Sequence, residues 1–460
     1  MNKIKELYEN NKREIFIMIS ILLIYTLVFK SFYPGIFTYD SHVQWNEVIT
    51  GKLTNSHPFL STYFILLLSI IHKTTTPILF FQIIISSLTI TKIFKITRHT
   101  NMKLWLEIIL AILISSLPIL CLYNITLWKD ILYSYYLINY GIYLYEWRIN
   151  NYKFDENKYI IMGLLLFLVF NYRLNGMVVS PILLIITLII MIRKKINKKN
   201  VLYLIVSFVF LNLLLLIPKN YYLRKNPKDD NSVNIGTINT YIKWIYGGYL
   251  TDGIITNNED LKYLNLLTDI DEWKKVYNPY LINDTNVLYM DYEYLLKTQN
   301  KFRKIFIDAT LNNPTSFIKH YLKADALLIN PLSKGYIYSY EFQGIPENNE
   351  IFINKIYRKL IIFTTSNKYI SLFYKPANIL YLCIIIVIIL NKIEKTKKYW
   401  LSILPMLVNT LSLLPINIAQ DLRYVYINYL TLIFIIIIAI NKFIARRNKN
   451  ESIINNSIIQ

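Results

Sequence analysis

The sequence predicts an all-α polytopic membrane protein, and its composition and patterning support this fold class. The chain has 460 residues, of which 54% are hydrophobic, and its mean hydropathy is +0.34. These values exclude an ordinary soluble domain. Long apolar runs recur along the chain, separated by short basic loops. Charged residues still make up 17% of the chain, so we also expect a sizeable aqueous part.

The formal net charge of +21 would indicate nucleic-acid binding in a soluble protein. Here the basic residues cluster in short loops between apolar runs, so we interpret them as orientation signals and expect no nucleic-acid partner. Cys121 and Cys383 both lie in apolar runs. The external part is therefore expected to have no disulfide, which is typical of a bacterial envelope protein. Residues 15–30 lack a small-residue cleavage site, so we expect no cleaved signal peptide.

The basic loops predict ten crossings with both termini cytoplasmic in the cell membrane. Residues 1–14 are basic, which keeps the N-terminus inside. Residues 59–71 are short and partly polar, and treating them as a surface helix puts every later basic loop inside. The ten predicted crossings are residues 15–30, 77–94, 104–124, 131–147, 159–172, 177–192, 201–218, 376–390, 399–418 and 425–441.

Three regions follow from this pattern. Residues 1–218 form an N-terminal transmembrane module with a first external loop at 31–58. Residues 219–375 contain no long apolar run and nearly balanced charges, which predicts an external, mainly helical domain. Asn313-Pro314 predicts the start of one of its helices. Residues 376–460 form the C-terminal transmembrane helices and a cytoplasmic tail.

The first external loop contains the carboxylate of greatest interest, Asp40. Pro34-Gly35 predicts a turn after the first apolar run. Ser41 and Gln44 have the spacing of a capping box, which predicts a helix that begins at Ser41. Asp40 would then precede the helix N-terminus, where the dipole favours the ionised form. Asp40 is either a general base for a lipid-linked substrate or simply a cap.

The unusual charges at membrane depth all fall on the external side in this topology. Charged groups there are costly unless they are paired or lie in a wet cavity, so they indicate a functional site. Such a set could bind a lipid phosphate and position a hydroxyl nucleophile. The alternative is that ion pairs among them only hold helices together. The residues are Asp40, His57, Lys129, Asp130, Arg173, Asp421 and Arg423.

Several motifs in order along nearly the whole chain resemble the GT-C membrane glycosyltransferases, in an uncharacterised bacterial branch. The motifs are Pro34-Gly35, Asp40, His57-Pro58, Trp128-Lys129-Asp130, Arg173-x-Asn175-Gly176, Asn313-Pro314 and Asp421-x-Arg423-Tyr424. That superfamily includes protein O-mannosyltransferases and lipid A aminoarabinose transferases. The resemblance implies a GT-C fold and sugar transfer from a polyprenyl-phosphate donor on the extracytoplasmic face.

By position, Asp40 matches the family's catalytic acid in the first loop. This chain lacks a second adjacent carboxylate, because Ser41 follows Asp40 and Glu47 is too far along to pair. We therefore expect a single-step inverting transfer with Asp40 as the base. Lys129, Arg173 and Arg423 are expected to bind the donor phosphate.

The remaining site residues have supporting roles. His57 is expected to orient Asp40 or the acceptor, or else to cap the helix begun by Pro58. The substrate pocket is expected to include Trp128, Asp130, Asn175, Asp421 and Tyr424, although interfacial aromatic residues also anchor helices. Asp40, His42 and His57 could together ligate a divalent metal. No cofactor is otherwise expected.

The expected enzyme is a hexosyltransferase whose partners are the lipid bilayer, the polyprenyl-phosphate sugar and an envelope glycan, glycolipid or protein acceptor. A polysaccharide polymerase or ligase shares these features but typically uses a pyrophosphate-linked donor. A lipid-linked-sugar transporter or flippase would need polar residues across the bilayer midplane and an internal repeat, which the sequence lacks. A membrane scaffold would not explain charges gathered on one face.

Overall fold

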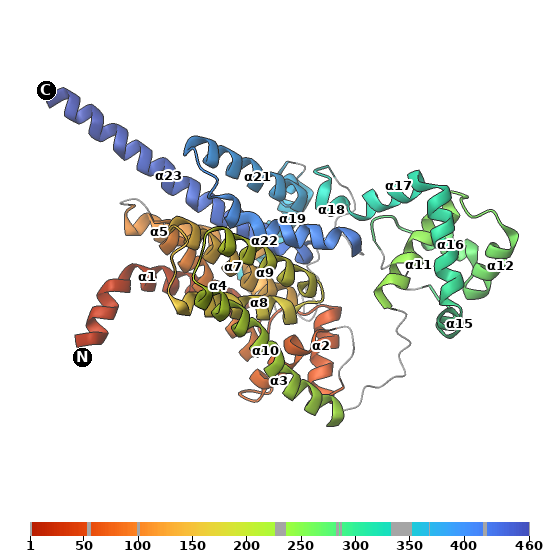
Figure 1. Ribbon diagram of the computed structural model, residues 1–460. Coiled ribbons are helices and arrows are strands. Elements are labelled where there is room, and N and C mark those ends of the chain that lie inside the picture. Colours follow the sequence, from red (N-terminus) through yellow and green to blue (C-terminus); the bar gives the residue numbers. More distant parts are fainter. Residues whose placement is uncertain are drawn as a thin grey trace.

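The computed structural model describes residues 2–52, 57–98, 102–225, 236–281, 285, 288–332, 352–367, 369–416 and 421–459. Within these ranges the chain is helical and forms no β-strand, apart from one isolated parallel bridge between Ile36 and Thr126. Figure 1 shows a bundle of helices with a smaller helical domain at one end. The predicted all-α class is confirmed.

In the part of the chain that the structure describes, six helices are long and apolar enough to cross a membrane. They arise from the apolar runs of the sequence, since each covers roughly the bilayer's hydrocarbon thickness of about 30 Å at 1.5 Å per residue. Four have helix bounds Thr76–Thr97 (α4), Gly176–Arg193 (α9), Lys198–Lys225 (α10) and Pro376–Ile393 (α21). The other two lie within α1 (Asn2–Ser31) and α23 (Tyr426–Ile459).

A seventh candidate span is broken. Residues 104–124 form α5 (Leu104–Ser115) and α6 (Pro118–Asn124), which meet at an angle of 70°. Pro118 at the start of α6 cannot donate a backbone hydrogen bond to the preceding turn, so the helix does not run straight through. The predicted single crossing at 104–124 is therefore a bent pair.

The other predicted crossings also form helices, but shorter or more polar ones. They are α7 (Lys129–Ile149), α8 (Glu156–Tyr172) and α22 (Trp400–Leu413). α7 is buried on most sides against α4, α8, α22 and α23, and its many tyrosines lower its hydropathy. A count of ten crossings remains a prediction, as does the orientation of the termini.

α10 is the most exposed of the candidate spans and presents apolar side chains such as Leu213 and Ile217, 57% and 68% exposed. It ends at Lys225, so it continues past the predicted end of that crossing at residue 218. A long apolar helix with so little protein around it is typical of a membrane-spanning helix that faces lipid.

The first external loop contains two short helices, α2 (Tyr39–Thr50) and α3 (Phe59–Ser69). The prediction that α2 begins at Ser41 was wrong. Thr38 is the N-cap, and it forms the capping box with Ser41 as the third helical residue. Asp40 consequently lies in the first turn of α2 and not before it. α3 has 11 residues and is too short to span a bilayer.

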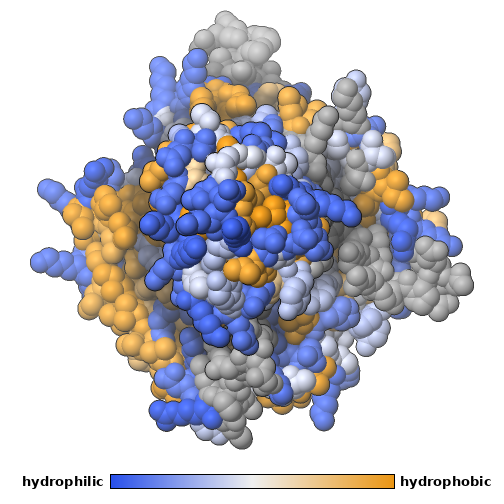
Figure 2. Space-filling model, turned by 90° about the vertical axis from the view of Figure 1, so that its right-hand side faces the viewer, coloured by the Kyte–Doolittle hydropathy of each residue, from blue (hydrophilic) through white to orange (hydrophobic). Residues whose placement is uncertain are grey.

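The domain between α10 and α21 extends from α11 (Gly236–Thr251) to α18 (Ala326–Ile329) and is called the α11–α18 domain. Its helices pack around their own apolar core. Trp273, Tyr246 and Phe302 lie at its centre with almost no exposure. Figure 2 looks onto this end of the molecule and shows hydrophilic residues over most of the face, with a small apolar area near its middle and larger apolar areas to the side. The other helices here are α12 (Asn258–Leu267), α13 (Ile270–Val276), α15 (Tyr292–Lys297), α16 (Gln299–Asn312), α17 (Pro314–Ala324) and α18 (Ala326–Ile329).

Short elements connect this domain back to the bundle. α19 (Phe352–Ser366) and α20 (Ile370–Phe373) precede α21, and α19 packs on α1 and α6.

The 3-10 helices η2 (Leu414–Ile416) and η3 (Leu422–Val425) lie between α22 and α23. η3 contacts α7, α22 and α23, which brings Asp421 and Arg423 to the end of the bundle that carries the first loop.

Candidate functional site

The seven charged residues singled out in the sequence come from five separate parts of the chain and lie in one cluster. Asp40 is on α2, His57 precedes α3, Lys129 and Asp130 begin α7, Arg173 ends α8, and Asp421 and Arg423 belong to the η3 segment.

Arg423 joins two carboxylates. Its Nη1 lies 2.6 Å from Asp40 Oδ2 and its Nε lies 2.8 Å from Asp421 Oδ2. Asp421 is the N-cap of η3 and accepts the backbone N–H of Arg423 at 3.1 Å. The guanidinium also lies 5.1 Å from the ring centre of Trp128 and 5.2 Å from that of Tyr424. Arg423 is therefore held by charge and by aromatic rings at once.

Arg173 and Asp130 form a second, more buried pair. Arg173 Nε lies 2.8 Å from Asp130 Oδ1, and the two side chains are only 9% and 4% exposed. Arg173 Nη1 donates to the carbonyl oxygen of Tyr424 at 3.1 Å, and its guanidinium lies 4.6 Å from the Tyr424 ring centre. This pair ties the ends of α7 and α8 to η3. Losing one partner would leave an uncompensated buried charge.

His57 and Lys129 form the third pair, at 2.8 Å between Nδ1 and Nζ. Burial, together with the positive charge of Lys129, lowers the pKa of His57 to about 4. The imidazole is therefore neutral near pH 7, and because an ammonium group can only donate, Nδ1 accepts the hydrogen bond from Lys129. The charges of Asp40, Asp130 and Arg423 also act on His57, which joins the three pairs into one cluster.

The cluster is close to electrically balanced. Asp40, Asp130 and Asp421 supply three carboxylates, and Lys129, Arg173 and Arg423 supply three cations. Burial raises the pKa of Asp421, while Arg423 acts in the opposite direction. Asp40 differs from the other two carboxylates in access: its side chain is 40% exposed, against 4% for Asp130 and 14% for Asp421.

The first loop is fastened to the segment before α7. Ile36 N–H donates to Ile125 O at 2.9 Å, and Leu127 N–H donates back to Ile36 O at 3.2 Å. Ser41 Oγ donates to Leu127 O at 2.9 Å. Upstream, Gly35 has φ +119°, which suits glycine, and a Cβ there would meet Leu79 at 2.3 Å. The turn predicted at Pro34-Gly35 thus delivers the chain to this junction.

Trp128 serves as a link between the loop and the cluster. Its indole N–H donates to the Oγ1 of Thr38, the N-cap of α2, at 2.8 Å. The side chain is only 4% exposed. Trp128 therefore positions α2, and with it Asp40, in addition to packing against Arg423.

Asn175 lies beneath the cluster in a buried amide network. Its Nδ2 donates to Asn409 Oδ1 at 3.0 Å, and Asn409 Nδ2 donates to Tyr424 O at 3.3 Å. Tyr133 Oη also donates to Asn409 Oδ1, at 2.9 Å. Asn175 is 5% exposed, so in this arrangement it supports the position of Tyr424.

Sequence reasoning did not single out two supporting residues, Asn409 and Gln82. Gln82 Nε2 donates to the carbonyl oxygens of Tyr123, Asn124 and Thr126 at 3.0–3.1 Å, which holds the strand-like segment beside Ile36. Asn409 is buried on α22 and Gln82 on α4, and both helices are mainly apolar. A polar amide in such a helix was the available signal.

The structure brings His57 but not His42 into the cluster. The His42 ring is exposed and lies 5.4 Å from the ring of Phe37. Among the described residues, no group of three or more His, Cys, Asp or Glu side chains is arranged to hold a metal ion. Asp40 and His57 each have a cationic neighbour in the cluster instead.

Comparisons of the chain with family profiles, with curated proteins and with solved structures give no match. The shape and chemistry of the cluster therefore carry the functional argument.

Proposed function

We propose that the protein is a GT-C-type membrane glycosyltransferase that transfers a sugar from a polyprenyl-phosphate donor to an envelope acceptor on the outer face of the membrane. The observation that carries the proposal is the cluster of three carboxylates and three cations at one end of an apolar helical bundle. Ionisable groups at helix ends in such a bundle indicate a reaction or binding site.

Asp40 is the carboxylate best suited to act as general base. It is the most exposed of the three, so an acceptor hydroxyl can approach it. Asp130 is enclosed with Arg173, and Asp421 caps η3, so both are committed to holding the site together.

The pairing of Asp40 with Arg423 suggests how donor binding prepares the base. The phosphate of the donor carries the same kind of charged oxygens as a carboxylate, and arginine binds both. A donor phosphate that approaches Arg423 would compete with Asp40 for Nη1. Asp40, released from its partner at 2.6 Å, would become available to the acceptor, while Asp421 keeps the guanidinium in place.

In the transfer step, the acceptor oxygen forms a bond to the anomeric carbon as the bond from that carbon to the phosphate oxygen breaks. The hydroxyl proton passes to Asp40, and the polyprenyl phosphate leaves with the electron pair. Arg423 and Lys129 stabilise the charge that develops on the phosphate. Neutral His57 fixes Lys129 through its Nδ1. Arg173, already bound to Asp130 and Tyr424, acts mainly by holding η3.

The test is sugar transfer in membranes from radiolabelled polyprenyl-phosphate hexoses. Asp40→Asn keeps the size of the side chain but removes the base, and Lys129→Ala removes one cation. Each is expected to lower the rate of transfer by about a hundredfold or more. Asp155→Asn, at the N-cap of α8 at the far end of that helix from Arg173, is the matched control and is expected to leave transfer unchanged.

Expression is matched by quantifying each variant in the same membranes. Undiminished transfer by both Asp40→Asn and Lys129→Ala would overturn these roles. Transfer only from pyrophosphate-linked donors would assign the protein to the polymerase or ligase class instead.

A further inference from the structure

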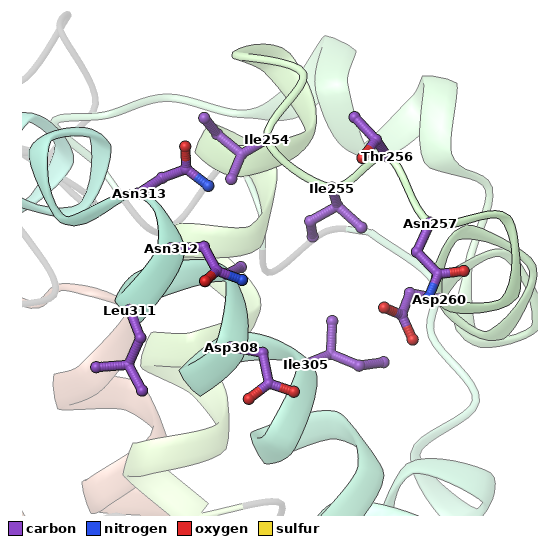
Figure 3. Close-up of a pocket in the computed structure, with 11 residues that line it drawn as sticks. Ile254, Ile255, Thr256, Asn257, Asp260, Ile305, Asp308, Leu311, Asn312 and Asn313 are labelled. Atoms are coloured by element: carbon purple, nitrogen blue, oxygen red, sulfur yellow. The ribbon is translucent and has the colours of Figure 1, made fainter.

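A solvent-open cavity of about 400 Å³ lies in the α11–α18 domain, separate from the charged cluster. Its walls are the connection from α11 to α12, the start of α12, and the C-terminal half of α16 with the residue that follows it. The volume is within the range of small-molecule sites, about 300–1,000 Å³. Figure 3 shows polar side chains around the space, with Asn312 and Asn313 on one side and Asn257 and Asp260 on the other.

The polar side chains of the cavity face solvent, with Asp308 and Asn312 exposed and Asp260 half-buried. Asp260, Asp308 and Asn312 make no side-chain hydrogen bond or ion pair with any other residue that the structure describes, and neither does the amide of Asn313. By contrast, Asn257 is the N-cap of α12 and accepts from Glu259 N–H. Carboxylates and primary amides can each bind two neighbouring hydroxyl groups in one plane.

The charges of the residues that line the cavity indicate which class of ligand it can bind. Among the residues that the structure describes, Asp260 and Asp308 are the charged ones that line the cavity, and no lysine or arginine lines it. An anion such as a phosphate or a uronic acid would meet repulsion there, whereas a neutral or amino-bearing ligand would not.

Apolar surface lies between the polar groups. Ile254, which is half-buried, lines the cavity beside the buried Ile255 and Ile305. A sugar ring has one face of C–H groups and an edge of hydroxyls, which matches an apolar surface bordered by amides and carboxylates.

We propose that this cavity is a binding site for a carbohydrate that carries no acidic group, with Asp260 and Asp308 as the acceptors for its hydroxyl or amino groups. The site is distinct from the cluster around Arg423, and its binding does not require that Asp40 be catalytic. In a glycosyltransferase it would hold a glycan away from the reacting carbon.

The test measures binding of three trisaccharides to the full chain in detergent by calorimetry: a neutral hexose trisaccharide, a glucosamine trisaccharide and a uronic-acid trisaccharide. We expect saturable binding of the first two and none of the third. Asp308→Asn and Asp260→Asn are each expected to weaken binding about tenfold or more, because hydrogen bonds to charged groups are strong.

Asp271→Asn is the matched control, since this carboxylate is in the same domain, 93% exposed, and outside the cavity. It is expected to bind as the wild type does, and so is Asp40→Asn, which separates this site from the proposed catalytic one. Circular dichroism checks that each variant is folded. The proposal is overturned if the wild type binds neither the neutral nor the amino trisaccharide, if the acidic one binds equally well, or if both cavity variants bind normally.

Discussion

At the residue scale, the pairing of neutral His57 with Lys129 makes the free energy of unfolding depend on pH. The side chain of His57 is buried, and its pKa is lowered from the ordinary value of 6.5 to about 4. Between these two values an unfolded chain binds a proton that the native His57 does not. The free energy of unfolding therefore falls as the pH falls from 6.5 toward 4. Above pH 6.5, His57 is neutral in both the folded and the unfolded chain, so it no longer changes the stability.

The prediction is that His57→Gln makes stability less dependent on pH across this range. Gln can still accept a hydrogen bond from Lys129 but does not titrate. The midpoint of thermal unfolding in detergent, measured at several pH values, should decline less steeply in the variant than in the wild type. His42→Gln, at an exposed position on α2, is the control. Parallel declines in wild type and His57→Gln would contradict the assignment.

At the element scale, the approach of α8 and α9 depends on Gly176. A Cβ at this position would lie 1.9 Å from the carbonyl oxygen of Val169 and 3.2 Å from Tyr133. The first of these contacts is with backbone and cannot be relieved by a side-chain rotation. This close approach places Arg173 and Asn175, which lie in the turn between the two helices, against Asp130 and Asn409.

Gly176→Ala is therefore expected to destabilise the protein by about 1–3 kcal/mol, as overpacking does in other cores. It is also expected to lower transfer, because the turn carries Arg173. Thermal unfolding in detergent measures the first effect. Met177→Ala, at a neighbouring side chain that is 47% exposed, should change the unfolding midpoint little. An unchanged midpoint in Gly176→Ala would mean that the helices can separate without cost.

Local rules predicted the helices better than their ends. Proline correctly marked the start of α17 at Pro314. The start of α2 was misplaced because Ser41 bonds to the N-cap residue Thr38 and to Leu127. The second bond is between residues 86 positions apart, so no local pattern could reveal it.

At the scale of the whole molecule, the bundle exposes apolar side chains such as Leu213, whereas the face of the α11–α18 domain in Figure 2 is largely hydrophilic. The predicted topology places that domain outside the cell and the basic loops inside. Because Cys121 and Cys383 are buried, a cysteine introduced at an exposed position would be the main target of a thiol reagent.

Leu311→Cys in the domain, at a side chain that is 73% exposed, is expected to react with a membrane-impermeant maleimide on intact cells. Lys195→Cys, in the turn after α9, is expected to react only after the membrane is permeabilised. Gel mobility of the labelled protein reports both. The reverse pattern would place the charged cluster on the cytoplasmic side and rule out transfer on the outer face.

The sequence by itself determined the helical membrane class, because apolar runs and basic loops are local properties that the bilayer selects directly. It also identified the charged residues, since an ionisable group beside an apolar run is conspicuous wherever it lies. Only the tertiary structure decided their partners: Arg423 with Asp40 and Asp421, Arg173 with Asp130, and Lys129 with His57. Pairing energy depends on distances of a few ångströms between segments that are far apart in the chain, such as those that carry Asp40 and Arg423, and those distances are set by the packing of the whole bundle.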